Sequence, residues 1–192
     1  MAEDVKVYRV PLGLIAFSMG LILEAASLFF PWWRRFSGQG SIWSIFPYQS
    51  VTETPFHVVE SLWSTIRPGL LTALRLPFTI MCLSLILSAA GLTLLSLGKR
   101  SRFIGTLYAA GGALSILSFA FFEVGVSHFL EDRGIALFGS FNSTRWGLAL
   151  GSHLALAGGA SSAVGGLLHL FKPEGLSLEI VVEREPGEEK DA

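Results

Sequence analysis

Four long apolar stretches fill most of the chain and limit what it can fold into. They run over residues 11–33, 74–97, 103–126 and 147–171, and each is 23 to 25 residues long. A helix needs about 20 apolar residues to cross the hydrocarbon of a bilayer, where only helices and closed barrels satisfy their backbone groups. The stretches lack the alternation of barrel strands. The sequence therefore predicts an all-α membrane protein, a bundle of four transmembrane helices.

The composition points the same way. The chain is 51% hydrophobic and 15% charged, whereas soluble domains carry roughly 25% charged residues. With a formal net charge of −1 and one short basic cluster at residues 99–102, the chain offers no nucleic-acid surface. Its one cysteine, Cys82, cannot form an intrachain disulfide. We expect membrane lipid, and no nucleic acid, around this protein. The scarcity of Asn and Gln fits a thermophile and a membrane composition equally.

The first stretch reads as a retained helix rather than a cleaved signal peptide. Signal peptides have a basic start and an apolar core of about 7–15 residues. Here the chain starts with Ala2-Glu3-Asp4, its apolar stretch is longer, and Glu24 lies inside it.

Basic residues indicate the orientation. Lys99, Arg100 and Arg102 crowd the short link between the second and third stretches, and such links face the cytoplasm. We therefore expect a multi-pass protein of the plasma membrane with both termini cytoplasmic. Residues 1–171 form the transmembrane domain, and 172–192 form an acidic cytoplasmic tail. The sequon Asn142-Ser143-Thr144 falls in an outer loop, where Asn142 is either glycosylated or an unmodified loop residue.

The two outer loops, 34–73 and 127–146, differ in content. Residues 41–48 and 51–59 are rich in strand formers and are separated by a break, which predicts a small extracellular antiparallel sheet in the first loop. Residues 60–66 are expected to form a short helix that stops at Pro68-Gly69. In the tail, 176–182 is a candidate strand.

Several short motifs follow one another in a familiar order. Pro31-Trp32-Trp33-Arg34, Ser41-Ile42-Trp43, Phe56-His57-Val58-Val59-Glu60-Ser61-Leu62 and Leu71-Thr72-Ala73-Leu74-Arg75 resemble the P-x-W-R, G-L-W, C-K-V-Y-D-S-L and Q-A-A-R-A segments of the claudin superfamily. That superfamily includes claudins, peripheral myelin protein relatives and calcium-channel gamma subunits. The resemblance places family-motif residues at Trp33, Arg34, Trp43 and Arg75. It implies a four-helix membrane protein whose outer loops act in cell-surface or cell–cell interaction, or as an accessory subunit of a larger complex.

The chain also departs from the family. Both first-loop cysteines are absent, and on this register Phe46 and Phe56 take their places. We therefore expect a distant member in which these two rings touch on neighbouring strands, while Trp43 anchors the sheet to the helix ends. In the alternative register, both rings face the membrane interface.

Glu24, Glu123 and His153 are ionisable residues that lie inside the apolar stretches. Such residues are costly in a membrane and are candidates for function. They form either a cluster that handles protons or cations, or hydrogen bonds that fix helix packing. The expected partners are His153 or Arg145 for Glu123, and Ser84, Ser118 or His153 for Glu24.

Small residues recur every fourth position in the last stretch, at Gly147, Gly151, Ala155, Gly159 and Ala163. Such a stripe allows helices to approach closely. It serves packing within the chain or contact with another subunit.

No motif of a nucleophile, a phosphate-binding loop or a metal site occurs in the sequence. We expect no enzyme, no cofactor and no metal. The expected function is interaction through the outer loops with another membrane protein or with a second copy of the chain. The alternative is a small ion- or proton-handling transporter or channel subunit that uses Glu24, Glu123 and His153.

Overall fold

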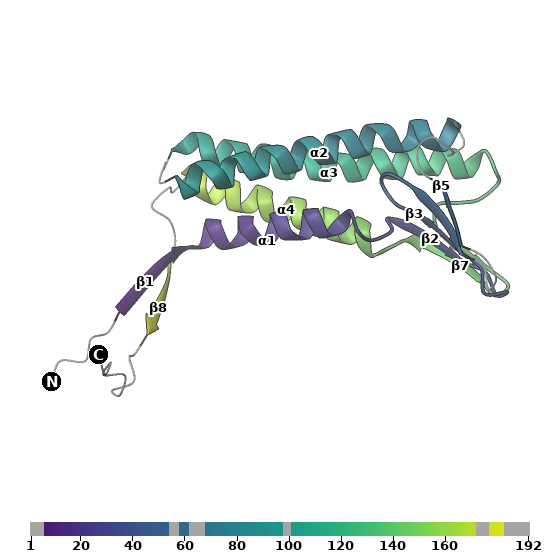
Figure 1. Cartoon of the computed structure of the whole chain (residues 1–192), viewed down its shortest axis with the longest axis horizontal. Coiled ribbons are helices and arrows are strands. Elements are labelled where there is room, and N and C mark those ends of the chain that lie inside the picture. Colours follow the sequence, from purple (N-terminus) through teal and green to yellow (C-terminus); the bar gives the residue numbers. More distant parts are fainter. Residues whose placement is uncertain (1–5, 54–57, 62–67, 98–100, 172–176, 183–192) are drawn as a thin grey trace, which may run out of the picture.

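A computed structural model describes residues 6–53, 58–61, 68–97, 101–171 and 177–182. Four helices lie side by side in one bundle: α1 (Leu12–Ser27), α2 (Pro68–Ser96), α3 (Arg102–Glu131) and α4 (Leu150–Phe171). A sheet covers one end of the bundle, here called the sheet end, and a two-stranded ribbon extends from the other, the ribbon end (Figure 1). Within the bundle α1 packs on α4, α4 on α3, and α3 on α2.

Among the described residues, three helices are long and apolar enough to cross a bilayer. They span Gly69–Ser96, Arg102–Glu131 and Leu150–Phe171. The first helix is shorter than expected. α1 has 16 residues and is therefore about 24 Å long at 1.5 Å per residue, whereas the hydrocarbon of a bilayer is about 30 Å thick.

The predicted helix over 11–33 begins within one residue of the expected position, but its C-terminal end is wrong. Pro11 closes a strand, and the helix stops at Ser27. Proline disfavours helical backbone in the residue before it, and it lacks an N–H donor itself. The chain beyond Pro31 is extended and bonds elsewhere, since the Trp32 amide donates to the Ile45 carbonyl over 2.8 Å and its own carbonyl accepts from Ala149 over 2.9 Å.

The other helix boundaries shift as well. α2 begins at Pro68 instead of residue 74, because proline fits the first turn of a helix, where no amide donor is needed. α3 continues past 126 to Glu131. α4 begins at Leu150 and not at Gly147, because Gly147 and Leu148 pair with a strand.

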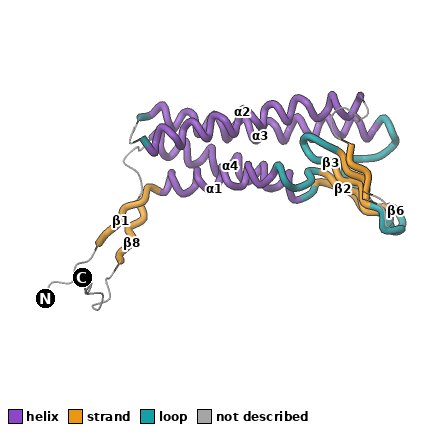
Figure 2. Tube along the Cα trace, viewed as in Figure 1, coloured by secondary structure: helices purple, strands orange, loops and turns teal. Residues whose placement is uncertain are grey.

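Six antiparallel strands form the sheet, in the order β5-β4-β3-β2-β7-β6 (Figure 2). Four come from the first outer loop: β2 (Trp33–Phe36), β3 (Ile42–Ile45), β4 (Ser50–Glu53) and β5 (Val58–Ser61). The second loop supplies β6 (Gly139–Phe141) and β7 (Thr144–Leu148), and β7 pairs with β2. The sheet is thus built from both of the loops 34–73 and 127–146, where the sequence predicted strands only in the first.

Two details of the first loop also differ from expectation. The predicted strand at 51–59 is two strands, β4 and β5, and residues 54–57 lie outside the described residues. Glu60 and Ser61 belong to β5 and not to a helix, while 62–66 lie outside the described residues.

The ribbon joins the two ends of the chain. β1 (Lys6–Pro11) pairs antiparallel with β8 (Ser177–Val182), with Lys6 opposite Val182. The candidate strand in the tail is therefore confirmed, and its partner β1 was not predicted. Figure 1 shows the ribbon leaving the bundle where α1 begins.

Two tryptophans, the fully buried Trp33 and the partly buried Trp43, hold the sheet on the helix ends. The Trp33 indole donates to the Leu137 carbonyl over 2.9 Å, and the Trp43 ring lies 5.2 Å from the Trp33 ring and 6.4 Å from the Phe129 ring of α3. Trp43 therefore anchors the sheet as predicted. The predicted contact between Phe46 and Phe56 cannot be followed, because Phe56 lies outside the described residues.

Candidate functional site

A single carboxyl group joins all four helices in the bundle interior. Glu24 of α1 is fully buried. Its Oε1 accepts a hydrogen bond from Ser162 of α4 over 2.7 Å, and its Oε2 lies 2.9 Å from Ser84 Oγ of α2. Ser84 Oγ is also 2.6 Å from the Gly111 carbonyl oxygen of α3. We call these four residues the Glu24 cluster, and Ser84 is one of the partners expected from the sequence.

The hydrogens available in the Glu24 cluster indicate its protonation. A serine hydroxyl carries one hydrogen, yet Ser84 Oγ lies within bonding distance of both Glu24 Oε2 and the Gly111 carbonyl. A carbonyl can only accept. Both short contacts are satisfied together when Glu24 carries a proton on Oε2. The protonated Oε2 then donates a hydrogen bond to Ser84 Oγ, and the Ser84 hydroxyl donates a hydrogen bond to the Gly111 carbonyl. An unpaired ionised carboxylate would also be costly in this apolar interior.

Glycines let the helices come close enough to build this cluster. A methyl group at Gly158 would lie 2.7 Å from the Glu24 amide nitrogen, and one at Gly20 would lie 2.6 Å from the Ser162 amide nitrogen. Contacts this short exist only without a side chain. Sequence reasoning missed Ser162, although its position four residues after Gly158 marks the same close face of α4.

The small-residue stripe of α4 packs inside the chain. A methyl group at Gly159 would lie 2.9 Å from the Gly112 carbonyl oxygen of α3, and one at Gly112 would lie 2.9 Å from Cα of Ala163. Ala155 is fully buried and accepts a hydrogen bond from Ser115 of α3 over 3.1 Å. Gly147 belongs to β7 instead of the stripe.

The other two predicted polar residues lie apart from Glu24. His153 is exposed, and its Nδ1 lies 2.9 Å from the Ala149 carbonyl in its own first turn. Glu123 is partly buried on α3, and within the described part of the chain no hydrogen bond or ion pair joins it to His153 or Arg145. The predicted pairing of Glu123 is therefore absent from those residues, because His153 bonds to its own helix and Arg145 lies in β7.

Three of the four family-motif residues come together in the sheet. Trp33 and Arg34 of β2 lie beside Trp43 of β3, and Arg34 donates from Nε to Ser44 Oγ over 3.1 Å. Arg75 is instead an exposed residue of α2.

One face of the sheet points away from the tryptophans. Arg34 and Phe36 alternate with the inward-facing Trp33 along β2, and Arg145 is the partner of Phe36 on β7. Phe138 lies against Gly147, the partner of Arg34. Phe36 is 45% exposed and Phe138 55%, and the Arg34 guanidinium lies 5.5 Å from the Phe36 ring centroid. We call these four residues, Arg34, Phe36, Phe138 and Arg145, the outer face.

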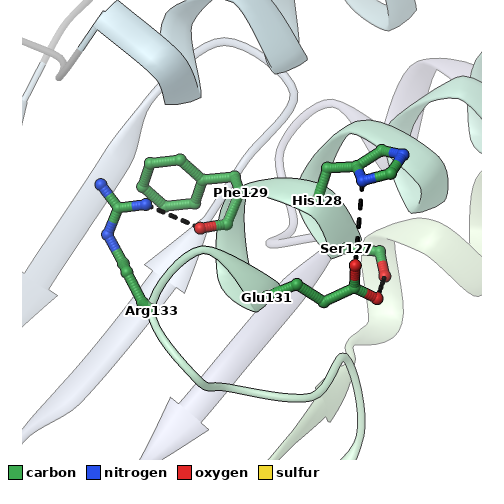
Figure 3. Close-up of polar contacts among 5 residues, drawn as sticks. All are labelled: Ser127, His128, Phe129, Glu131 and Arg133. Atoms are coloured by element: carbon green, nitrogen blue, oxygen red, sulfur yellow. Dashed lines mark hydrogen bonds and ion pairs between the residues drawn. The ribbon is translucent and has the colours of Figure 1, made fainter.

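The turn after α3 holds a further set of polar contacts (Figure 3). Ser127 donates to Glu131 Oε1 over 3.1 Å, and His128 Nδ1 lies 3.8 Å from Glu131 Oε2. Arg133 donates to the Phe129 carbonyl over 2.7 Å, with its guanidinium 3.6 Å from the Phe129 ring centroid. An open hollow of about 490 Å³ lies beside Glu131. These contacts tie side chains to one another and to the backbone at the end of α3. Among the described residues, no three His, Cys, Asp or Glu side chains gather where a metal could bind.

Asn142 occupies the turn between β6 and β7. It is exposed and has a φ of 51°, a conformation that asparagine tolerates better than most residues. The sequon is therefore sterically accessible, and its glycosylation stays a prediction.

A comparison of the sequence with protein-family models gives no match, and neither does a comparison with curated proteins.

Proposed function

We propose that this chain is a claudin-like, non-enzymatic membrane protein that binds another membrane protein, or a second copy of itself, through the outer face of its sheet. The observation that carries the proposal is the construction of the sheet. Both outer loops contribute strands to it, and Trp33 and Trp43 pack in one hydrophobic core with Phe129 and Leu130 at the end of α3. A surface held in this way loses little conformational freedom on binding.

The chemistry of the outer face supports this role. Aromatic residues and arginine are enriched in protein interfaces and among the residues that dominate binding energy. Phe36 and Phe138 expose large rings, and Arg34 and Arg145 lie on the same face. A partner that offers carboxylates and an apolar surface fits such a face.

The proposal includes four crossings of the plasma membrane. Leu28, Phe29 and Phe30 prolong the apolar surface of α1 beyond its last turn, and Phe29 is 76% exposed, so the short helix and its flank together reach across a bilayer. α2 ends and α3 begins at the ribbon end (Figure 1), and the sequence between them carries the basic residues Lys99, Arg100 and Arg102. The positive-inside rule then makes the ribbon end cytoplasmic and the sheet extracellular.

Affinity purification in mild detergent, quantified by mass spectrometry, tests the proposal. The test variant combines Phe36→Ser with Arg145→Ser. The matched control is Phe171→Ser, which removes a 76% exposed ring at the ribbon end. We expect a membrane protein, or a differently tagged second copy, to be lost from the test variant and retained by the control. Equal recovery from both variants would contradict the proposal.

The alternative function in ion or proton handling now depends on Glu24. His153 is exposed and bonds to its own helix, and Glu123 lacks a bond to either expected partner. The burial of Glu24 among four helices favours keeping this alternative. Proteoliposome flux that Glu24→Gln abolishes would support it.

A further inference from the structure

Polar groups are arranged differently on the two sides of the Glu24 cluster. Toward the sheet end, the buried serines donate to backbone carbonyls: Ser27 to Glu24, Ser118 to Pro77, Ser115 to Ala155, and Ser152 to Ala149, over 2.6 to 3.1 Å. Fully buried Trp32, Met81 and Phe122 fill the space around them. On this side the described serine hydroxyls are satisfied and the packing is apolar.

Toward the ribbon end, two buried hydroxyls lack partners. Ser88 Oγ and the Tyr108 hydroxyl make no hydrogen bond with the described residues. Ser88 lies one turn beyond Ser84 on α2 and against Gly111. Buried hydroxyls without a protein partner are groups that ordered water binds.

These groups follow one another along the bundle toward the ribbon end. The Tyr108 ring lies against Gly91 of α2, stacks on Phe17 of α1 at 3.5 Å between centroids, and lies 6.4 Å from the His169 ring. His169 is in the last turn of α4 and is 8% exposed. From Glu24 through Ser84, Ser88 and Tyr108 to His169, each group therefore lies farther toward the ribbon end than the one before it.

We propose that Glu24 is a proton-binding site that exchanges its proton with the ribbon end only, along Ser88, Tyr108 and His169. Water at the two free hydroxyls completes the path. A proton from solvent passes by His169, because an imidazole can both accept and donate a proton, and it binds the carboxylate of Glu24 at Oε2. It leaves by the same route, and no other bond is made or broken.

The proton also controls a contact between helices. With Glu24 protonated, Ser84 is free to donate to the Gly111 carbonyl. With Glu24 ionised, Ser84 must donate to the carboxylate, and that carbonyl loses its donor. Among the described residues, the elements around Glu24 direct no charged side chain at it: α2 offers Ser84, α3 the Gly111 carbonyl, and α4 Ser162. The titratable groups along the path are Tyr108 of α3 and His169 of α4.

Infrared spectroscopy of the purified full-length protein in lipid nanodiscs tests this proposal. The C=O stretch of a protonated carboxyl group is separate from carboxylate bands and shifts in D₂O. We expect such a band in the wild type, its loss in Glu24→Gln, and its retention in Glu123→Gln. A hydrophobic carbodiimide, which reacts with protonated carboxyls in apolar surroundings, should modify Glu24 of the wild type, as read by peptide mass mapping. A wild type whose Glu24 stays unmodified and shows no such band would overturn the proposal, whether or not the variant folds.

The direction of exchange has its own test. Tyr108→Phe keeps the ring on Phe17 and removes only the hydroxyl, and Ser88→Ala removes the second free group. Both should slow the D₂O shift of the Glu24 band at least tenfold. Ser115→Ala, a matched buried serine on the sheet side, should leave the rate unchanged. Equal rates in Tyr108→Phe and Ser115→Ala would overturn the path. Because the outer face takes no part in these readouts, the result is independent of the proposed binding function.

Discussion

Ser162 of α4 donates a hydrogen bond to Glu24 of α1 over 2.7 Å, across 138 residues of sequence. The bond ties the first helix to the last at the point where glycines bring their backbones together. Through Ser84 it extends to α2 and α3. The contribution of these hydrogen bonds to the stability of the bundle can be measured with variants of Glu24.

Glu24→Gln should be nearly as stable as the wild type, whereas Glu24→Ala should lose about 1–3 kcal/mol. The amide oxygen of glutamine can accept from Ser162 and its NH₂ can donate to Ser84, which reproduces a protonated carboxyl group. Alanine leaves both serines without that partner. Thermal unfolding in detergent measures the difference, and equal destabilisation by the two variants would contradict a protonated Glu24.

Gly158→Val should destabilise the bundle by about 1–3 kcal/mol. Its Cβ would collide with the backbone of α1 near Glu24, and backbone cannot move aside as a flexible side chain does. Ala160→Val, on the exposed side of the same helix, is the control and should have little effect. Chemical denaturation compares the two, and equal stabilities would mean that α1 and α4 are not closely packed here.

Trp33→Phe should loosen the sheet without unfolding the helices. The indole N–H bonds to the Leu137 carbonyl just before β6, and a net loss of about 0.5–1.5 kcal/mol is typical for one hydrogen bond. Hydrogen exchange should rise in β6 and β7 and stay unchanged in α3. If Trp33→Phe raised hydrogen exchange equally across the whole protein, the tryptophan would not be holding β6 and β7 locally.

The side of the membrane on which the sheet end and the ribbon end of the bundle lie can be tested with single cysteines in a Cys82→Ala background. Gln39→Cys lies at an exposed position beside the sheet, and Ser101→Cys lies at an exposed position of the link before α3. An impermeant maleimide should label Gln39→Cys on intact cells and Ser101→Cys only after lysis. The reverse pattern would invert the proposed orientation.

The sequence predicts that four helices form, because each has a long apolar stretch of its own, but it does not predict where they end. The ends of the helices and the strands that follow them depend on contacts with distant residues, and no local sequence pattern predicts those contacts. Trp33 reads as the end of an apolar stretch, yet it forms a strand because Ile45 and Leu148 supply its partners. The second loop has few strand formers, and β6 and β7 form because β2 offers an edge.

The polar residues show the same limit. The cost of burying a carboxyl group predicts that Glu24 faces the interior with a partner such as Ser84. Similar depth does not bring Glu123 and His153 together, because depth along a helix says nothing about the face on which a side chain lies.

The central claim, that the outer face binds a partner, is tested most directly by site-specific photo-crosslinking in intact cells. A photoreactive phenylalanine analogue replaces Phe36 on the outer face or Ile86 on α2, a 63% exposed residue expected to face lipid. The account predicts a crosslinked protein from position 36, competed away by excess unlabelled protein but not by its Arg145→Ser variant, and lipid adducts alone from position 86. No protein crosslinked at position 36 above the level at position 86 would contradict the account.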